Sequence, residues 1–165
     1  MMIEADRIKI QAISLQDIAR FSEYRDKEEV AMYQSWDEYP LNKAINRIEY
    51  CQKHPFHGQI GNYQFGLYLK ENNQLIGDIF IEIDGHTTFT LGYTLDSVYW
   101  SKGYASEALK SVFKAMNETY SFKICLCHVY EDNIKSIKLL ERNGFDKIHK
   151  SWFYQDVLYR KMLNK

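Results

Sequence analysis

One short loop carries the clearest chemical signal in this sequence. The segment Ser101-Lys-Gly-Tyr-Ala-Ser106 joins the end of a strand-like run to the start of an amphipathic helix. The first N–H groups of a helix have no partner within it, and together with the helix dipole they attract phosphate. A side chain at Gly103 would block a phosphate from approaching these donors. The loop therefore fits a phosphate or pyrophosphate, although an ordinary strand-to-helix turn accounts for the same residues.

Before this loop, the spacing of apolar residues changes along the chain from that of helices to that of strands. A strand is predicted at 8–12, a helix follows through 18–24, and another helix runs from Pro40 toward Pro55. Residues 26–40 are acidic and aromatic and are expected to form a short helix and a loop. The middle of the chain predicts an antiparallel meander of three strands, at 63–70, 74–84 and 87–95.

The elements after the loop complete a mixed α+β sheet with helices packed on it. The helix that begins at the loop has apolar residues on one face, from Ala105 to Met116. The run 122–130 is mostly apolar, which predicts a central strand covered on both faces. Asn133 is expected to cap a further helix that stops at Asn143-Gly144. Closing strands are predicted at 145–148 and 157–162, with a turn near Gln155-Asp156.

Composition narrows the class of protein. The chain has 165 residues, of which 45% are hydrophobic and 26% are charged, and this is typical of one globular domain spanning 1–165. No signal peptide or membrane span is visible, so a cytoplasmic protein is expected. The net charge is −1, which gives no reason to expect a nucleic-acid or membrane partner.

Cysteine and histidine usage predicts neither disulfides nor a metal site. Cys125 and Cys127 are two residues apart in a predicted strand and are expected to be small core residues on one face. His54 and His57 have no third ligand nearby, so no metal is predicted.

Two motifs resemble one known family. The segment from Trp100 to Leu109, WSKGYASEAL, resembles the acetyl-coenzyme A loop of the GNAT N-acetyltransferases, whose pattern is Q/R-x-x-G-x-G/A. Trp100 stands where Gln or Arg is usual, and this exchange is typical of the ribosomal-protein-alanine (Rim-type) branch. The segment from Asn133 to Phe145, NIKSIKLLERNGF, resembles that branch's N-x-x-S-x-x-x-L-E-x-x-G-F. The resemblance covers residues 6–163.

The resemblance implies a fold and a cofactor site. It implies a mixed, mostly antiparallel sheet with helices on both faces, in which the strands at 87–95 and 122–130 splay apart as a V. The backbone of Tyr93, Thr94 and Leu95 would pair with the pantetheine arm of acetyl-coenzyme A (acetyl-CoA), and Asn133 would contact the same region. A main-chain N–H near Tyr93 would polarise the thioester carbonyl. The pyrophosphate would be held by the N–H groups of Lys102, Gly103, Tyr104, Ala105 and Ser106. Gly92 fits a bulge in the strand, or a packing requirement.

Two positions depart from the family pattern at places where catalytic residues are usual. The branch's usual acid lies two residues before Gly92, and Thr90 stands there instead. Many GNAT enzymes have a Tyr general acid where this chain has Leu140. Ser136 matches the branch's Ser, which is proposed to contact the sulfur, although a first-turn Ser also bonds to the backbone. Tyr130 is the second candidate proton donor, with a buried structural role as its alternative.

Replacement bases can be named but not chosen from the sequence. Asp78, Glu82 and Asp84 alternate along one strand, where they would form a solvated face. His86 follows a turn and is expected at the surface, and His128 in the apolar strand is expected to be a satisfied core histidine. Asp156 matches an Asp of the branch, and a turn or hairpin role explains it equally well. Without a dedicated acid at Thr90, the amine would lose its proton through water.

The expected activity is direct transfer of acetyl from acetyl-CoA to a primary amine, in a ternary complex. The acceptor would be a protein N-terminus or a small amine; the aromatic and acidic cluster of Tyr33, Trp36 and Tyr39 would attract a cation or pack as a lid. The alternative is a coenzyme A-binding sensor or structural module without turnover. A monomer and a homodimer both fit, the latter through Trp152, Phe153 and Tyr154.

Overall fold

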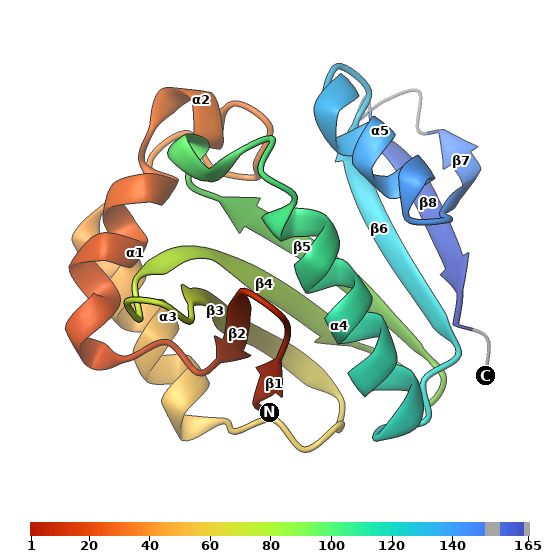
Figure 1. Cartoon of the computed structure of the whole chain (residues 1–165), viewed down its shortest axis with the longest axis horizontal. Coiled ribbons are helices and arrows are strands. Elements are labelled where there is room, and N and C mark those ends of the chain that lie inside the picture. Colours follow the sequence, from red (N-terminus) through yellow and green to blue (C-terminus); the bar gives the residue numbers. More distant parts are fainter. Residues whose placement is uncertain (151–155, 164–165) are drawn as a thin grey trace.

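An eight-stranded sheet organises the chain in the computed structural model, which describes residues 1–150 and 156–163 (Figure 1). Trp152, Phe153 and Tyr154, the expected dimer edge, and most of the predicted turn near Gln155 lie outside the described residues. The order of the strands is β1-β2-β3-β4-β5-β6-β8-β7, and every neighbouring pair is antiparallel except β5 and β6. The predicted mixed, mostly antiparallel α+β sheet is therefore confirmed.

The N-terminal elements are short. They are β1 (Ile3–Glu4), β2 (Ile8–Gln11), α1 (Ile18–Arg25), α2 (Glu28–Ala31) and α3 (Leu41–Lys53). Ser14 caps a 3-10 turn at Leu15–Asp17 by accepting a hydrogen bond from the N–H of Gln16. The short strand β1 was not expected from the sequence.

The remaining elements follow the predicted order. They are β3 (Gly61–Leu69), β4 (Leu75–Ile83), β5 (Thr88–Leu95), a 3-10 turn (Ser97–Tyr99), α4 (Tyr104–Glu118), β6 (Ile124–Tyr130), α5 (Ile134–Arg142), β7 (Asp146–Lys150) and β8 (Asp156–Met162). Asn133 caps α5 as predicted, and α5 ends before Gly144, which has a φ of +78°. Gly92 pairs with Phe80 in a regular register, so the bulge considered there is absent.

The V-shaped splay is visible in the register of the two parallel strands. β5 and β6 pair only from Thr88 to Thr90, opposite Ile124 to Leu126. Beyond these pairs both strands continue, β5 to Leu95 and β6 to Tyr130, and they separate (Figure 1). Among the described residues, the edge of β5 from Leu91 to Leu95 therefore has no strand partner on the side of β6.

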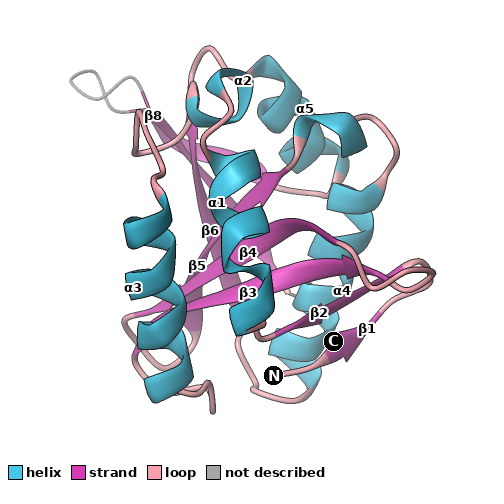
Figure 2. Ribbon diagram, turned by 90° about the vertical axis from the view of Figure 1, so that its left-hand side faces the viewer, coloured by secondary structure: helices cyan, strands magenta, loops and turns pink. Residues whose placement is uncertain are grey.

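Helices cover the two faces of the sheet unequally. α4 packs on one face, here the α4 face, and α1 and α3 pack on the other, the α3 face (Figure 2). The larger core lies on the α4 face and includes Ile79, Leu109 and Cys127, and a smaller core includes Phe21, Tyr24 and Ile48.

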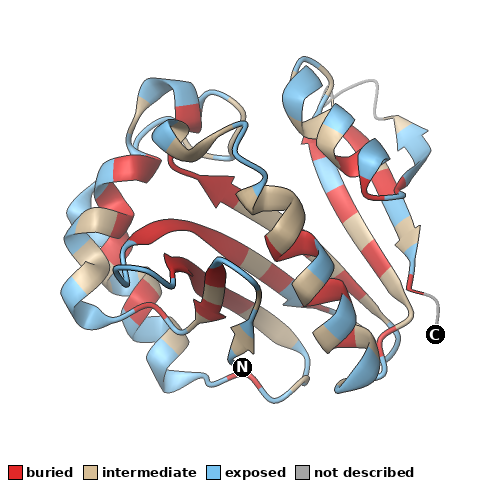
Figure 3. Ribbon diagram, viewed as in Figure 1, coloured by how far each residue is buried: buried red, intermediate tan, exposed pale blue. Residues whose placement is uncertain are grey.

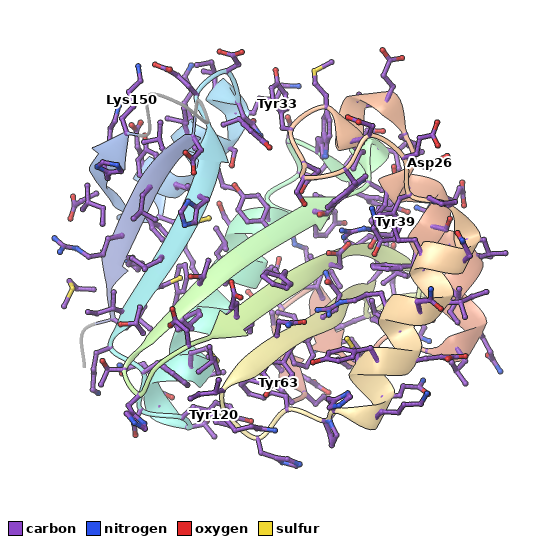
Figure 4. The ribbon with its side chains drawn as sticks, turned by 180° about the vertical axis from the view of Figure 1, so that it is seen from behind. Asp26, Tyr33, Tyr39, Tyr63, Tyr120 and Lys150 are labelled. Atoms are coloured by element: carbon purple, nitrogen blue, oxygen red, sulfur yellow. The ribbon has the colours of Figure 1, made fainter. Side chains whose placement is uncertain are left out.

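β6 is not covered on both faces, which corrects the sequence prediction. Cys125, Cys127 and Val129 are buried on the α4 face, whereas His128 and Tyr130 are exposed on the other (Figure 3). Seen from the α3 face, the described helices α1 and α3 lie over the other end of the sheet and leave β6 and β8 uncovered (Figure 4). The apolar composition of this strand predicts burial on both faces. In the structure, one set of alternate residues packs in the core and the other set faces solvent.

Candidate active site

A cavity of about 720 Å³ opens where β5 and β6 separate. Its walls come from the end of β5, the loop leading into α4, the end of β6, the start of α5 and the segment around α2. This volume lies within the range of pockets that hold small molecules and cofactors. Among the described helices, none is long and apolar enough to span a membrane.

The loop before α4 presents unpaired backbone donors to this cavity. Gly103 is the N-cap of α4, with a φ of +85°, and no side chain caps the helix. The N–H groups of Lys102 through Ser106 donate no hydrogen bond to any described residue. Gly103 is therefore required by its left-handed backbone as well as by space. This arrangement can bind a phosphate or pyrophosphate.

Arg7 holds this loop from outside the predicted motif. Its Nη1 donates to the carbonyl oxygen of Lys102 at 3.0 Å, and its Nε pairs with Glu107 at 2.8 Å. Its guanidinium also lies over the Tyr104 ring, 4.4 Å from the centroid. Arg7 thus joins the segment before β2 to the start of α4 and fixes the orientation of the donors. No local pattern in the sequence indicates this contact, because Arg7 and its partners lie about 100 residues apart.

Tyr93 and Ser136 form a hydroxyl pair in the cavity wall. The phenol oxygen of Tyr93 and Oγ of Ser136 are 2.5 Å apart, and either oxygen can be the donor. The side chain of Asn133 accepts a hydrogen bond from the N–H of Ser136, which fixes the first turn of α5. The Ser136 hydroxyl therefore bonds to a side chain and not to the backbone. The phenol of Tyr93 was not predicted to take part.

Burial keeps the hydroxyl and thiol groups near this pair protonated. Burial raises the pKa of Tyr93 far above its usual value. Burial likewise raises the pKa of Cys127 to about 12, and this thiol is free. Tyr93 is thus a neutral hydroxyl at physiological pH, able to donate a hydrogen bond or a proton.

Ionic contacts fasten the segment around α2 at the cavity rim. Lys27 pairs with Asp96, just after β5, at 2.6 Å, and Asp96 also pairs with Arg20. Ser97 donates a hydrogen bond to Glu29 at 2.7 Å. These contacts place Tyr33 at the rim, and Figure 4 shows it near the open end of the splay.

Asp78 belongs to a buried network, which corrects its assignment to a solvated face. Only 1% of Asp78 is exposed, whereas Glu82 on the same strand and Asp84 just after it are exposed as expected. Nη1 of Arg25 lies 2.7 and 2.8 Å from the two carboxylate oxygens, and Tyr24 and Gln64 donate to them as well. Both carboxylate oxygens of Asp78 accept hydrogen bonds, and Asp78 is not part of the cavity wall. Its role is therefore structural.

The aromatic cluster packs around the same arginine. The guanidinium of Arg25 lies 3.8 Å from the centroid of the Trp36 ring and 4.3 Å from that of Tyr39. Tyr39 is buried, whereas Tyr33 remains at the cavity. Packing on the core thus accounts for Trp36 and Tyr39, and only Tyr33 is placed to meet a ligand.

His128 is not a core histidine. Its side chain is 55% exposed, lines the cavity, and places Nδ1 3.0 Å from Oδ2 of Asp156 on β8. The sequence prediction was wrong because β6 is uncovered on the α3 face. Asp156 lies in β8, paired opposite Tyr130, and not in a turn. His86 is exposed, as expected, in the turn between β4 and β5.

Most of the predicted cofactor residues line one cavity. These are Tyr93, Thr94, Leu95, Gly103, Tyr104, Ala105, Ser106, Asn133 and Ser136. Lys102 is not among the lining residues; its ammonium lies over the Tyr99 ring. Tyr130 is exposed and borders a separate small pocket with Tyr33. It therefore does not line the cavity that contains Ser136.

Comparison with known proteins also indicates an acetyltransferase. Residues 7–146 match the acetyltransferase (GNAT) domain. The uncharacterized N-acetyltransferase p20 of Bacillus licheniformis is 26% identical over 145 residues, which cover 86% of this chain and 80% of p20. A GNAT-family acetyltransferase from Bacillus anthracis superposes with a TM-score of 0.84 at 20% identity, covering 99% of each chain.

A second solved structure carries a bound coenzyme A species. Mycobacterium smegmatis RimJ in complex with CoA-disulfide superposes with a TM-score of 0.84 at 16% identity, covering 98% of this chain and 87% of RimJ. At such identity the similarity concerns the fold. The domain match spans most of the chain, and the chain therefore belongs to the GNAT family of acetyl-CoA-dependent N-acetyltransferases.

Proposed function

We propose that this protein transfers acetyl directly from acetyl-CoA to a primary amine, with both substrates bound in the cavity between β5 and β6. The observation that carries this proposal is the Tyr93–Ser136 hydroxyl pair, which lies in the same cavity as the unpaired N–H groups at the start of α4. The hydroxyl pair can stabilise a leaving sulfur, and the N–H groups can bind phosphate. Together they match the two ends of the pantetheine arm of acetyl-CoA, which are the thioester and the pyrophosphate.

Each part of the cofactor has a proposed position on the α4 face. The pyrophosphate lies against the N–H groups of Gly103 through Ser106, and the pantetheine arm pairs with the free edge of β5 from Tyr93 to Leu95. The N–H of Tyr93 or a neighbour donates to the thioester carbonyl oxygen, where negative charge develops during attack. Asn133 helps indirectly, since it holds Ser136 in place.

The reaction needs no metal and no covalent enzyme intermediate. The amine nitrogen attacks the carbonyl carbon, a C–N bond forms, and the C–S bond breaks. The nitrogen gives up one proton, and the sulfur leaves with a proton supplied from the Ser136–Tyr93 pair, which solvent replenishes. Holding both substrates together supplies much of the rate enhancement.

The open side of the cavity supports a peptide as the acceptor. The cofactor occupies the α4 face, so the amine enters from the α3 face, where β6 and β8 are uncovered (Figure 4). An extended N-terminal peptide fits such a surface, and the sequence resemblance to the Rim-type branch favours a protein N-terminus over a small amine. Tyr33 at the rim is placed to contact the incoming cation.

A panel of amines tests the proposed function. Purified protein is mixed with acetyl-CoA and peptides beginning with Ser, Ala or Met, spermidine or kanamycin; free thiol and acetylated product are measured. We expect at least one peptide to give stoichiometric thiol and N-terminally acetylated product. Binding of coenzyme A without turnover of any amine would contradict the proposal and favour a coenzyme A sensor.

A further inference from the structure

The α3 face of the splay carries a histidine–aspartate pair in which only the aspartate, Asp156, matches a residue of the Rim-type branch. His128 lies two residues beyond Leu126, the last residue of β6 that pairs with β5, and Gly92 lies two residues beyond Thr90 on the other strand. Because alternate residues of a strand share a face, His128 and Gly92 line opposite walls of the opening on the same face. His128 therefore stands on the α3 face at the depth where the two strands part.

Asp156 fixes the orientation of this imidazole. Its carboxylate contacts Nδ1 of His128 at 3.0 Å, across the diagonal of the antiparallel β6–β8 pair. A carboxylate at Nδ1 favours the tautomer with the proton on that nitrogen, which leaves Nε2 as an acceptor. The same logic orients the base in a Ser-His-Asp triad, where the aspartate acts through the histidine.

The other candidate groups of the sheet are unsuited to take a proton. Thr90 replaces the usual acid, and Asp78 is enclosed by Tyr24, Arg25 and Gln64. Tyr93 and Cys127 line the cavity, but burial raises the pKa of both groups. Imidazole, by contrast, is the side chain that ordinarily changes charge between about pH 5 and about pH 8.

We infer that His128 is the general base that takes the proton from the acceptor amine, and that Asp156 is its positioning residue. This inference rests on the proposed function. As the nitrogen attacks the thioester carbon, its proton passes to Nε2 of His128, directly or through one water, while the C–S bond breaks on the α4 face. The imidazolium then releases this proton to solvent, and the Asp156 carboxylate stabilises it meanwhile.

The surroundings of His128 leave few other groups able to set a pH profile. On the α3 face, β8 presents Asp156 and Arg160, and β6 itself presents Tyr130. β5 contributes no titratable group there, since its residues on this face are Thr90, Gly92 and Thr94. The segment around α2 brings Glu29 and Tyr33 to the cavity, and the loop after β6 brings Asp132. Glu29 already accepts a hydrogen bond from Ser97. A decline in rate at low pH is attributed to His128 only if it disappears in a His128 variant.

The decisive experiment compares His128→Gln with His149→Gln, using the best peptide from the amine panel. His149 is an exposed histidine on β7 that does not line the cavity, so its variant controls for loss of an imidazole. We expect His128→Gln to lower kcat/KM for the amine about a hundredfold and to abolish the decline in rate at low pH. Affinity for acetyl-CoA by calorimetry stays within about twofold, and His149→Gln behaves as wild type.

Variants of Asp156 test its positioning role through kcat/KM and the pH profile. Asp156→Asn should lower kcat/KM about tenfold and shift the acid limb to lower pH, because the imidazolium loses its counter-charge; Asp156→Glu should restore part of both. A merely structural role for Asp156 would lower thermal stability and leave the limb in place.

The outcomes separate the two proposals. Wild-type turnover with an unchanged pH profile in His128→Gln overturns the assignment of the base and leaves the proposed function standing. No turnover by the wild type with any amine overturns both.

Discussion

The two sides of the cavity present different kinds of groups to the proposed ligands. On the α4 face these are mostly backbone N–H groups, held by a left-handed glycine and by Arg7. On the α3 face they are side chains, above all His128 with Asp156. Backbone recognition tolerates sequence change, whereas side-chain recognition changes with each residue. We therefore expect cofactor binding to be common to the family, and the base and the acceptor to be particular to this chain.

The largest expected effect concerns the stability of the α3 face. Asp78→Ala removes the partner of the buried Arg25 and should destabilise the fold by about 3–5 kcal/mol. Urea unfolding measures this loss, and Asp84→Ala, at an exposed position just after the same strand, should stay within about 0.5 kcal/mol of wild type. Equal stability of the two variants would mean that the network contributes nothing.

The second effect concerns the leaving group on the α4 face. Ser136→Ala should lower kcat about tenfold to a hundredfold with little change in KM, because its contact with sulfur strengthens as the thiolate forms. Steady-state kinetics at saturating amine measures this. Tyr93→Phe keeps the ring and removes the same hydrogen bond, so it should reproduce much of the loss. A rise in KM at constant kcat would show that Ser136 only binds the cofactor.

The third effect concerns the backbone donors. Gly103→Glu adds bulk and negative charge beside the proposed pyrophosphate and imposes a side chain on a φ of +85°. Affinity for acetyl-CoA should fall at least about tenfold, or about 1.4 kcal/mol, while the cooperative unfolding transition remains. Gly85→Glu is the matched control, because a side chain there meets no atom within 4 Å. Unchanged affinity by calorimetry would exclude the loop as the phosphate site.

The sequence predicted the α4 face better than the α3 face for a physical reason. The phosphate loop depends on local features: a strand end, small residues, a glycine and a helix start. Asn133 capping α5 is local in the same sense. The Tyr93–Ser136 pair joins residues 43 positions apart, so no local pattern indicates it.

The errors share one cause. His128 and Asp78 were assigned from the pattern of their own strands, as a buried histidine and a solvated carboxylate. Their true environments depend on which helix covers each part of the sheet: α1 covers Asp78, and no described helix covers His128. Alternation along a strand shows which residues share a face but not what covers that face.

A crystal structure with coenzyme A and an acceptor peptide would show directly which face of the sheet each substrate occupies. Our proposal places the pyrophosphate at the N–H groups of Gly103 through Ser106, the sulfur within hydrogen-bonding distance of the Ser136 hydroxyl, and the peptide amine on the α3 face beside Nε2 of His128. A cofactor bound outside the cavity between β5 and β6, or an amine that reaches the sulfur from the α4 face, would contradict it.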